Sequence, residues 1–136
     1  MANEILDLQV EYNALAQRVA PWPSGTYGFL TVPSDNGNFH VEFVDGEYHY
    51  IATERGTEVS RQVTRSRDEM LYWLVSDLAF WLSVQYELKH RIEGQDCRRI
   101  MFEHRQELMD RAGTEMADRL RDELAAIVSE NPFLDQ

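Results

Sequence analysis

The side chains that could do chemistry in this chain fall into a few small groups, and the first is a pair. Glu87 and His90 match the Glu-x-x-His pattern, which is half of a di-iron carboxylate site in helical bundles. That site needs a second such pair and two further glutamates on facing helices, and the sequence supplies neither. We therefore interpret this stretch as a polar helix edge with a Glu87–Arg91 ion pair at i,i+4.

His40, Glu42 and His49 form the second group, because a predicted hairpin brings them to one face. Two imidazoles and a carboxylate are possible zinc ligands. Exposed strand faces commonly carry such residues without a metal, so we predict neither a metal site nor a cofactor.

Asp77 and Cys97 stand alone. Asp77 lies in the most apolar stretch of the chain, where a bare charge is costly, so we predict a structural role. It either faces solvent at a rim or pairs with an arginine, the candidates being Arg61, Arg98 and Arg99.

Cys97 is the single cysteine, which excludes an intramolecular disulfide and predicts a buried structural thiol. Glycine-rich phosphate loops and Cys-x-x-Cys pairs are absent, so the sequence predicts no enzyme.

The stretch Asp68–Arg91 must position most of these groups. It is mostly apolar between Met70 and Leu88 and contains no glycine or proline, which predicts one long helix. Its polar residues follow a narrow stripe that includes Ser76, Ser83, Glu87 and His90. A surface helix shows the reverse pattern, so we expect this helix to be the central buried element.

The chain before it predicts a helix and then a sheet. Asn3 is a candidate N-cap for a helix that ends near Val19, before Pro21-Trp22-Pro23. The hydrophobic period then changes to two, and Asp45-Gly46 is a strong two-residue hairpin signal. The predicted antiparallel meander has four strands: Tyr27–Val32, Phe39–Val44, Glu47–Thr53 and Thr57–Thr64.

The hairpin fixes which residues share a face of this sheet, because a slip of one residue would exchange the two faces. The face expected to pack on the central helix carries Phe39, Val41, Phe43, Tyr48, Tyr50 and Ala52. If Arg55-Gly56 is a second two-residue turn, Val59 and Val63 join this face, with Arg61 opposite Tyr50.

Two further helices complete the chain. Asp96 is expected to cap the first, which ends at Gly113, and Thr114 to cap the second, which ends at Asn131-Pro132. Phe133-Leu134 is a candidate hydrophobic latch that folds back on the helices. The sequence thus predicts one α+β domain over residues 1–136: a helix, four strands and three helices.

The charge is strongly negative, with 24 acidic against 13 basic residues. Residues 1–53 contain seven acids and one base, Arg18. Such a balance repels nucleic acid and anionic membranes and attracts basic partners, although solubility alone also explains it. The sequence shows no signal peptide or uninterrupted apolar run, so a cytoplasmic location is expected.

An ordered set of short motifs resembles the immunity protein 63 family of bacterial polymorphic-toxin systems. The resemblance covers about residues 10–130 and rests on Tyr48-His49-Tyr50, Glu54-Arg55-Gly56, Leu71-Tyr72-Trp73, Tyr86-Glu87-Leu88, Arg91, Asp96, Arg98-Arg99 and Phe102. It implies a small protein without catalytic residues that binds and neutralises the C-terminal domain of a toxin encoded beside it. The acidic balance suits a basic toxin such as a nuclease. The alternative is an acidic intracellular regulator or adaptor that binds a basic housekeeping protein.

Two sets of residues follow as hypotheses. The candidate toxin contacts are acidic residues of the hairpins and polar residues of the central helix: Asp35, Glu42, Asp45, Glu47, Glu87 and His90. The candidate structural ion pairs involve Glu54, Arg61, Asp77, Arg98 and Arg99.

Overall fold

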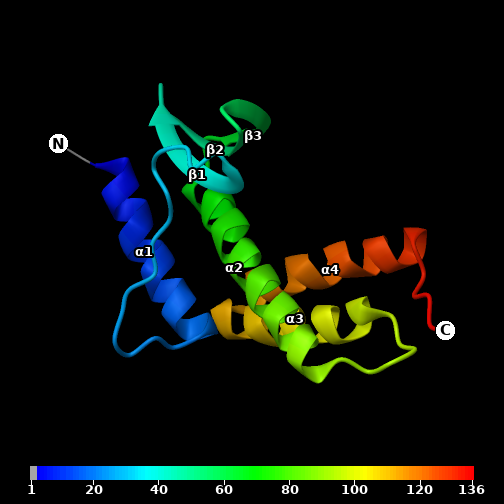
Figure 1. Cartoon of the computed structure of the whole chain (residues 1–136). Coiled ribbons are helices and arrows are strands. Elements are labelled where there is room, and N and C mark those ends of the chain that lie inside the picture. The colour runs from blue at the N-terminus through cyan, green and yellow to red at the C-terminus, as the bar shows by residue number, and fades with distance from the viewer. Residues whose placement is uncertain (1–2) are drawn as a thin grey trace. The chain divides into compact units, whose positions relative to one another are not determined.

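The computed structural model describes residues 3–136 and confirms the α+β class, with a helix, an antiparallel sheet and three helices. The sheet has three strands in the order β1-β2-β3, not four. In chain order the elements are α1 (Glu4–Val19), β1 (Asn36–Val44), β2 (Glu47–Glu54), β3 (Thr57–Thr64), α2 (Arg67–His90), α3 (Cys97–Ala112) and α4 (Thr114–Glu130) (Figure 1).

The chain forms two compact units. The first contains the residues up to Ala14 and Trp22–Leu74, and the second contains Leu15–Pro21 and Val75–Gln136. The first unit therefore holds the sheet, and the second holds α3 and α4. Helices α1 and α2 each contribute residues to both units. None of the helices in residues 3–136 combines the length and apolar character that crossing a membrane requires.

The β1–β2 hairpin of the first unit has the predicted register. Val44 lies opposite Glu47, and Phe43 lies opposite Tyr48. The turn residues Asp45 and Gly46 both have positive φ, 52° and 78°, which is the type I′ geometry of a two-residue hairpin. The Asp45-Gly46 dipeptide therefore predicted the alignment of the two strands correctly.

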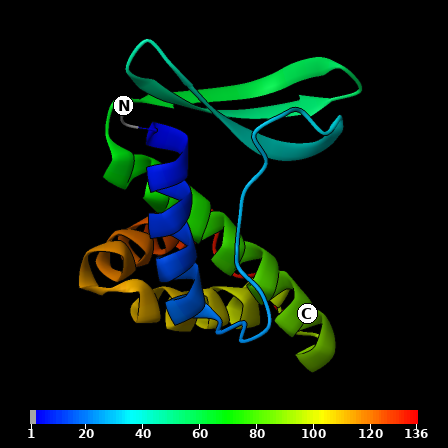
Figure 2. The ribbon, with the colours of Figure 1, turned by 90° about the vertical axis from the view of Figure 1, so that its left-hand side faces the viewer.

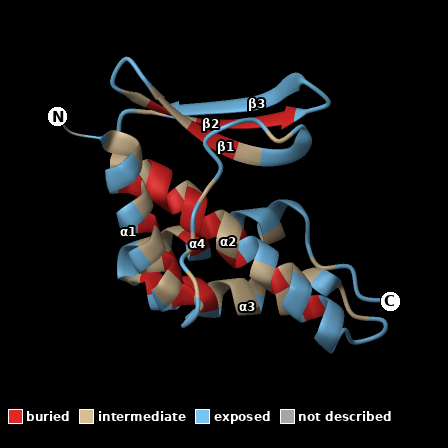
Figure 3. Cartoon of the chain, turned by 60° about the vertical axis from the view of Figure 1, so that its left-hand side comes forward, coloured by how far each residue is buried: buried red, intermediate tan, exposed pale blue. Residues whose placement is uncertain are grey.

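The aromatic face of the sheet is buried as predicted. Val41, Tyr48, Tyr50 and Ala52 are all buried, and β2 is the most buried strand of the sheet (Figure 3). The Tyr50 ring stacks with Trp73 at the start of α2, with ring centroids 6.1 Å apart. Packing of this face on the first half of α2 thus forms the core of the first unit.

The prediction that Val59 and Val63 of β3 belong to the aromatic face of the sheet is wrong. Arg55 and Gly56 form the expected two-residue turn, but the register shifts between Ala52 and Thr53, leaving Val59 as an extra residue. Because one extra residue reverses the alternation of side chains, Gln62 rather than Arg61 lies opposite Tyr50. Val59 and Val63 are exposed, at 58% and 43%, as is every other residue of β3 up to Val63.

The predicted strand Tyr27–Val32 is an extended loop that meets the sheet at a single parallel bridge, between Leu30 and His40 (Figure 2). Other contacts of this segment go to α1. The Asn13 side chain accepts a hydrogen bond from the backbone N–H of Tyr27 at 2.8 Å, and Phe29 packs edge-on against Tyr12. The segment therefore reaches a helix on one side only, because Leu30 and Val32, on its other side, are 40% and 64% exposed.

Helix α2 is buried less evenly than predicted. In its second half the polar Ser76, Ser83 and Glu87 are buried, whereas Trp81 and Leu88 are 57% and 62% exposed. Burial of the polar stripe is possible because its groups have partners. Ser83 donates to the carbonyl of Phe80 at 2.7 Å, and Ser76 accepts a hydrogen bond from Arg105 at 2.8 Å.

Helices α3 and α4 pack against each other in the second unit and run in opposite directions (Figure 1). Asp96 caps α3 as predicted, accepting from the backbone N–H of Arg98. Thr114 is the first residue of α4 rather than its cap, which is Gly113. Cys97, the first residue of α3, is exposed and not buried as predicted. The buried residues of the two helices are Leu108, Met109 and Ala112, and Ala117, Leu120 and Leu124.

Candidate functional site

The outer face of the sheet, in the first unit, carries a group of paired polar side chains. His40 is buried, and its Nε2 lies 2.7 Å from Oε2 of Glu42; since a carboxylate only accepts, this nitrogen carries the proton. Arg61 donates two hydrogen bonds to Glu58, at 3.0 and 2.7 Å, and its Nη1 lies 2.6 Å from Nδ1 of His49. The hydrogen bonds from Arg61 lower the pKa of the Glu58 carboxyl.

This arrangement separates the three residues considered as zinc ligands. His40 faces Glu42, whereas His49 faces the guanidinium of Arg61. A cation at that position competes with a metal ion for the same imidazole. Within residues 3–136, no three His, Cys, Asp or Glu side chains are grouped so as to hold a metal ion.

The acidic residues of the hairpins differ in accessibility. Asp35 holds the β2–β3 turn, because its carbonyl accepts from the N–H of Arg55 at 3.0 Å and its carboxylate accepts from that of Gly56 at 3.1 Å. The side chains of Glu42 and Glu47 are 40% and 36% exposed. We define the hairpin face as Glu42, Asp45 and Glu47, the acidic residues at or near the β1–β2 turn.

Glu87 and His90 lie in different surroundings in the second unit. The Glu87 side chain is only 3% exposed and accepts two hydrogen bonds from Arg91, at 3.0 and 2.8 Å. These bonds lower the pKa of the Glu87 carboxyl. The expected i,i+4 ion pair is thus present and leaves little of Glu87 for a partner. His90 is exposed and stacks on Tyr86 with ring centroids 4.0 Å apart.

The Tyr86 ring is the centre of a three-ring stack. His104 of α3 stacks on it at 3.9 Å, nearly parallel at 7°. Two imidazoles this close cannot share one face of the ring without overlapping, so His90 and His104 cover opposite faces. Beside the stack is a hollow of about 240 Å³, which we name the α2–α3 hollow. It is lined by the three rings and by Ile92, Ile100, Glu103 and Glu107.

Glu103 and Glu107 were not predicted from the sequence as site residues. They lie one turn apart on the exposed side of α3, and each reads as an ordinary solvated helix residue. Only the packing of α3 against the end of α2 turns them into the rim of a hollow. Their i,i+4 spacing was the only signal in the sequence.

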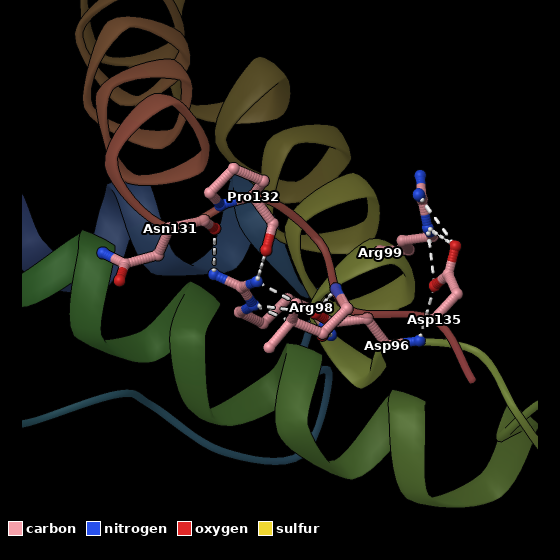
Figure 4. Close-up of polar contacts among 7 residues, drawn as sticks. Asp96, Arg98, Arg99, Asn131, Pro132 and Asp135 are labelled. Atoms are coloured by element: carbon pink, nitrogen blue, oxygen red, sulfur yellow. Dashed lines mark hydrogen bonds and ion pairs between the residues drawn. The ribbon is translucent and has the colours of Figure 1, made fainter.

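The predicted structural arginines pair with acids near them. Arg98 binds Asp96 and donates to the carbonyls of Asn131 and Pro132, at 2.9 and 3.0 Å (Figure 4). Arg99 binds Asp135 at 2.9 Å. We name these contacts the tail clasp, because they hold the end of the chain against the start of α3. Arg98 and Arg99 therefore have structural ion pairs, and their acidic partners are Asp96 and Asp135.

Asp77 is half-buried on α2, and Glu54 is exposed at the end of β2. The three arginines considered as partners of Asp77 bind other acids: Glu58, Asp96 and Asp135.

Arg67 joins three elements of the first unit and was not singled out from the sequence. It lies 3.0 Å from Glu4 and 3.3 Å from Glu11 of α1, and its Nε donates to the hydroxyl of Tyr48 in β2 at 3.2 Å. These contacts raise its pKa above the ordinary arginine value. The sequence contained a signal for these partners. A positive charge in the first turn of a helix is unfavourable because of the helix dipole, so an arginine there needs acidic neighbours to offset the cost.

Comparison with known proteins gives one match. The family model described as immunity protein 63 matches residues 45–126, which is more than half of the chain. The matched region runs from the β1–β2 turn into α4 and includes the α2–α3 hollow. No curated protein and no solved structure matches the chain. The chain belongs to the immunity protein 63 family.

Proposed function

We propose that this protein binds a cognate bacterial toxin in the cytoplasm and neutralises it as a stoichiometric, non-enzymatic inhibitor. The observation that carries the proposal is family membership over residues 45–126. The polar groups support binding rather than catalysis, because the ionic side chains at the centre of each cluster are already paired. Examples are Glu58 with Arg61 and Glu87 with Arg91.

The charge supports a basic toxin, such as a nuclease. The whole chain has a formal charge of −11, and its first unit contains eleven acidic against four basic residues. An acidic surface raises the rate at which a basic protein is encountered and can cover a site that binds nucleic acid. We further infer that residues 1–136 act as one domain, because α1 and α2 each run from one unit into the other.

The hairpin face is the surface we propose for the first encounter. Glu42, Asp45 and Glu47 lie on or beside a short type I′ turn, which is fixed before binding and so loses little conformational entropy in a complex. Asp35 belongs to a neighbouring turn that it holds by its own hydrogen bonds. It is therefore better regarded as a support for the sheet than as a contact.

Co-expression tests the function directly. The C-terminal domain of the toxin that we expect to be encoded beside this gene is expressed in a bacterial host with the chain, or with an unrelated protein of similar size and charge. We expect only the chain to restore growth and to form a complex of defined stoichiometry in size-exclusion chromatography and calorimetry. Continued toxicity without a complex would refute the proposal. Isolation of a basic housekeeping protein in its place would favour the adaptor function.

A further inference from the structure

The α2–α3 hollow is lined by both apolar and acidic side chains. Ile92 and Ile100 supply apolar side chains, and the three stacked rings line the hollow beside them. Glu103 and Glu107 supply two carboxylates from successive turns of α3, and neither lysine nor arginine lines the hollow. An opening with this character suits a long side chain that has an apolar stem and a cationic end.

The side chains that line the hollow contact one another before any ligand is present. Tyr86 lies between His90 and His104, and these contacts restrict the movement of the three rings. Nδ1 of His90 lies 2.8 Å from the carbonyl of Tyr86, and Nδ1 of His104 lies 3.6 Å from Glu107. A site that is already ordered loses little entropy when it is occupied, so its contacts contribute more fully to affinity.

We propose that the α2–α3 hollow receives an arginine side chain of the bound toxin, an inference that rests on the proposed function. The methylene stem lies along Ile92 and Ile100, and the guanidinium reaches Glu103 and Glu107. Arginine fits better than lysine for two reasons. Its planar fork of donors can bind two carboxylates at once, and its flat, weakly hydrated head packs well beside aromatic rings.

The test removes the two rim charges without changing side-chain shape. The Glu103→Gln, Glu107→Gln variant is compared with Asp122→Asn, Glu130→Gln, which removes two charges from exposed positions of α4. We expect the hollow variant to weaken toxin binding by about tenfold or more, mainly through faster dissociation, because inserted contacts break only when the complex separates. The α4 control should change affinity by less than about threefold.

A second variant fills the hollow and leaves its charge unchanged. Ile100→Trp places a large ring where the stem of the arginine would lie, so it should also speed dissociation; circular dichroism and the melting temperature check its fold. On the toxin, surface arginines are changed to alanine one at a time. One of these alanine substitutions should weaken binding to the wild-type chain but not to the Glu103→Gln, Glu107→Gln variant.

The outcomes separate this inference from the proposed function. If the wild-type chain binds the toxin and the hollow variant binds with the same rates, the inference is wrong and the immunity function stands. Equal losses in the hollow variant and the α4 control would also overturn it, since they would show general electrostatic attraction only. If the wild-type chain forms no complex, the proposed function itself fails.

Discussion

Asp96 is the residue at which the polar contacts of the tail clasp meet. One carboxylate oxygen caps α3 through the N–H of Arg98 at 2.9 Å, and the other accepts from the N–H of Leu134 at 2.9 Å. The guanidinium of Arg98 adds further hydrogen bonds to both oxygens. These donors, the Arg98 side chain foremost, hold the pKa of Asp96 far below its ordinary range.

A stability profile against pH tests this role. Because the folded pKa of Asp96 lies below the unfolded value of about 3.9, its contribution is full above that value and is lost as pH falls toward the folded pKa. Asp96→Asn keeps an oxygen for the cap but removes the charge, so it should lower the melting temperature at pH 7 by several degrees. Between pH 4 and pH 2 the difference from wild type should narrow.

Asp122→Asn, at an exposed position of α4, serves as the matched control. It should leave the melting temperature nearly unchanged over the whole range, as surface substitutions usually do. Equal melting temperatures of wild type and Asp96→Asn at pH 7 would show that the charge of Asp96 contributes nothing to the clasp.

At the scale of elements, the two hairpin turns share one geometry but not one sequence. Asp45-Gly46 and Arg55-Gly56 both have positive φ at each turn residue. Asparagine and aspartate visit this region readily because their short polar side chains hydrogen-bond to the nearby backbone, whereas the Cβ of other residues is strained there. Arg55→Asn should therefore stabilise the protein by about 0.5–1 kcal/mol, measured by urea denaturation. Arg55→Ala, which does not relieve the strain, should give no gain.

The tail clasp also makes a prediction about the end of the chain. Phe133 lies beneath the guanidinium of Arg99, 4.3 Å from ring centroid to Cζ, and its ring meets Phe102 at 6.1 Å. Leu134 beside it is 78% exposed. Phe133→Ala should cost about 1–2 kcal/mol of unfolding free energy, and Leu134→Ala less than about 0.5 kcal/mol. If the two substitutions lower the unfolding free energy equally in denaturant titrations, the Phe133 ring does not hold the Phe133-Leu134 segment in place.

The elements that the sequence predicted well are those with strong local signals. The Asp45-Gly46 turn and period-two alternation predicted the β1–β2 register, and Asp96 predicted the start of α3. The bulge at Val59 has no such signal, because one extra residue in a strand leaves the composition unchanged. The false strand Tyr27–Val32 has apolar residues on both sides, and period alone cannot tell a strand from a loop packed on a helix.

The candidate site was harder to predict because burial depends on partners far along the chain. The polar stripe of α2 looked accessible, yet Ser76 is bound by Arg105, which lies 29 residues later. Glu87 is similarly closed off by Arg91. The accessible acids beside that stripe, Glu103 and Glu107, come from another helix, and no pattern in the sequence joins them to Tyr86.

For the molecule as a whole, charge and shape are expected to act at different stages of binding. The excess of acids in the first unit creates a field that extends into solvent, where salt screens it over about 10 Å. Such a field changes how often a basic partner arrives. The α2–α3 hollow acts only on contact, and so changes how long the partner stays.

The hairpin face can be tested by this difference in kinetics. Glu42→Gln, Asp45→Asn, Glu47→Gln should slow association with the toxin domain by about three- to tenfold at low salt and flatten its salt dependence, with little effect on dissociation. The control removes the same charge from α4 with Glu115→Gln, Asp122→Asn, Glu130→Gln. Stopped-flow association rates at several salt concentrations decide between them. If both triple variants associate more slowly than wild type by the same factor, the overall charge rather than the hairpin face steers the toxin. If neither variant differs from wild type, electrostatic steering is absent.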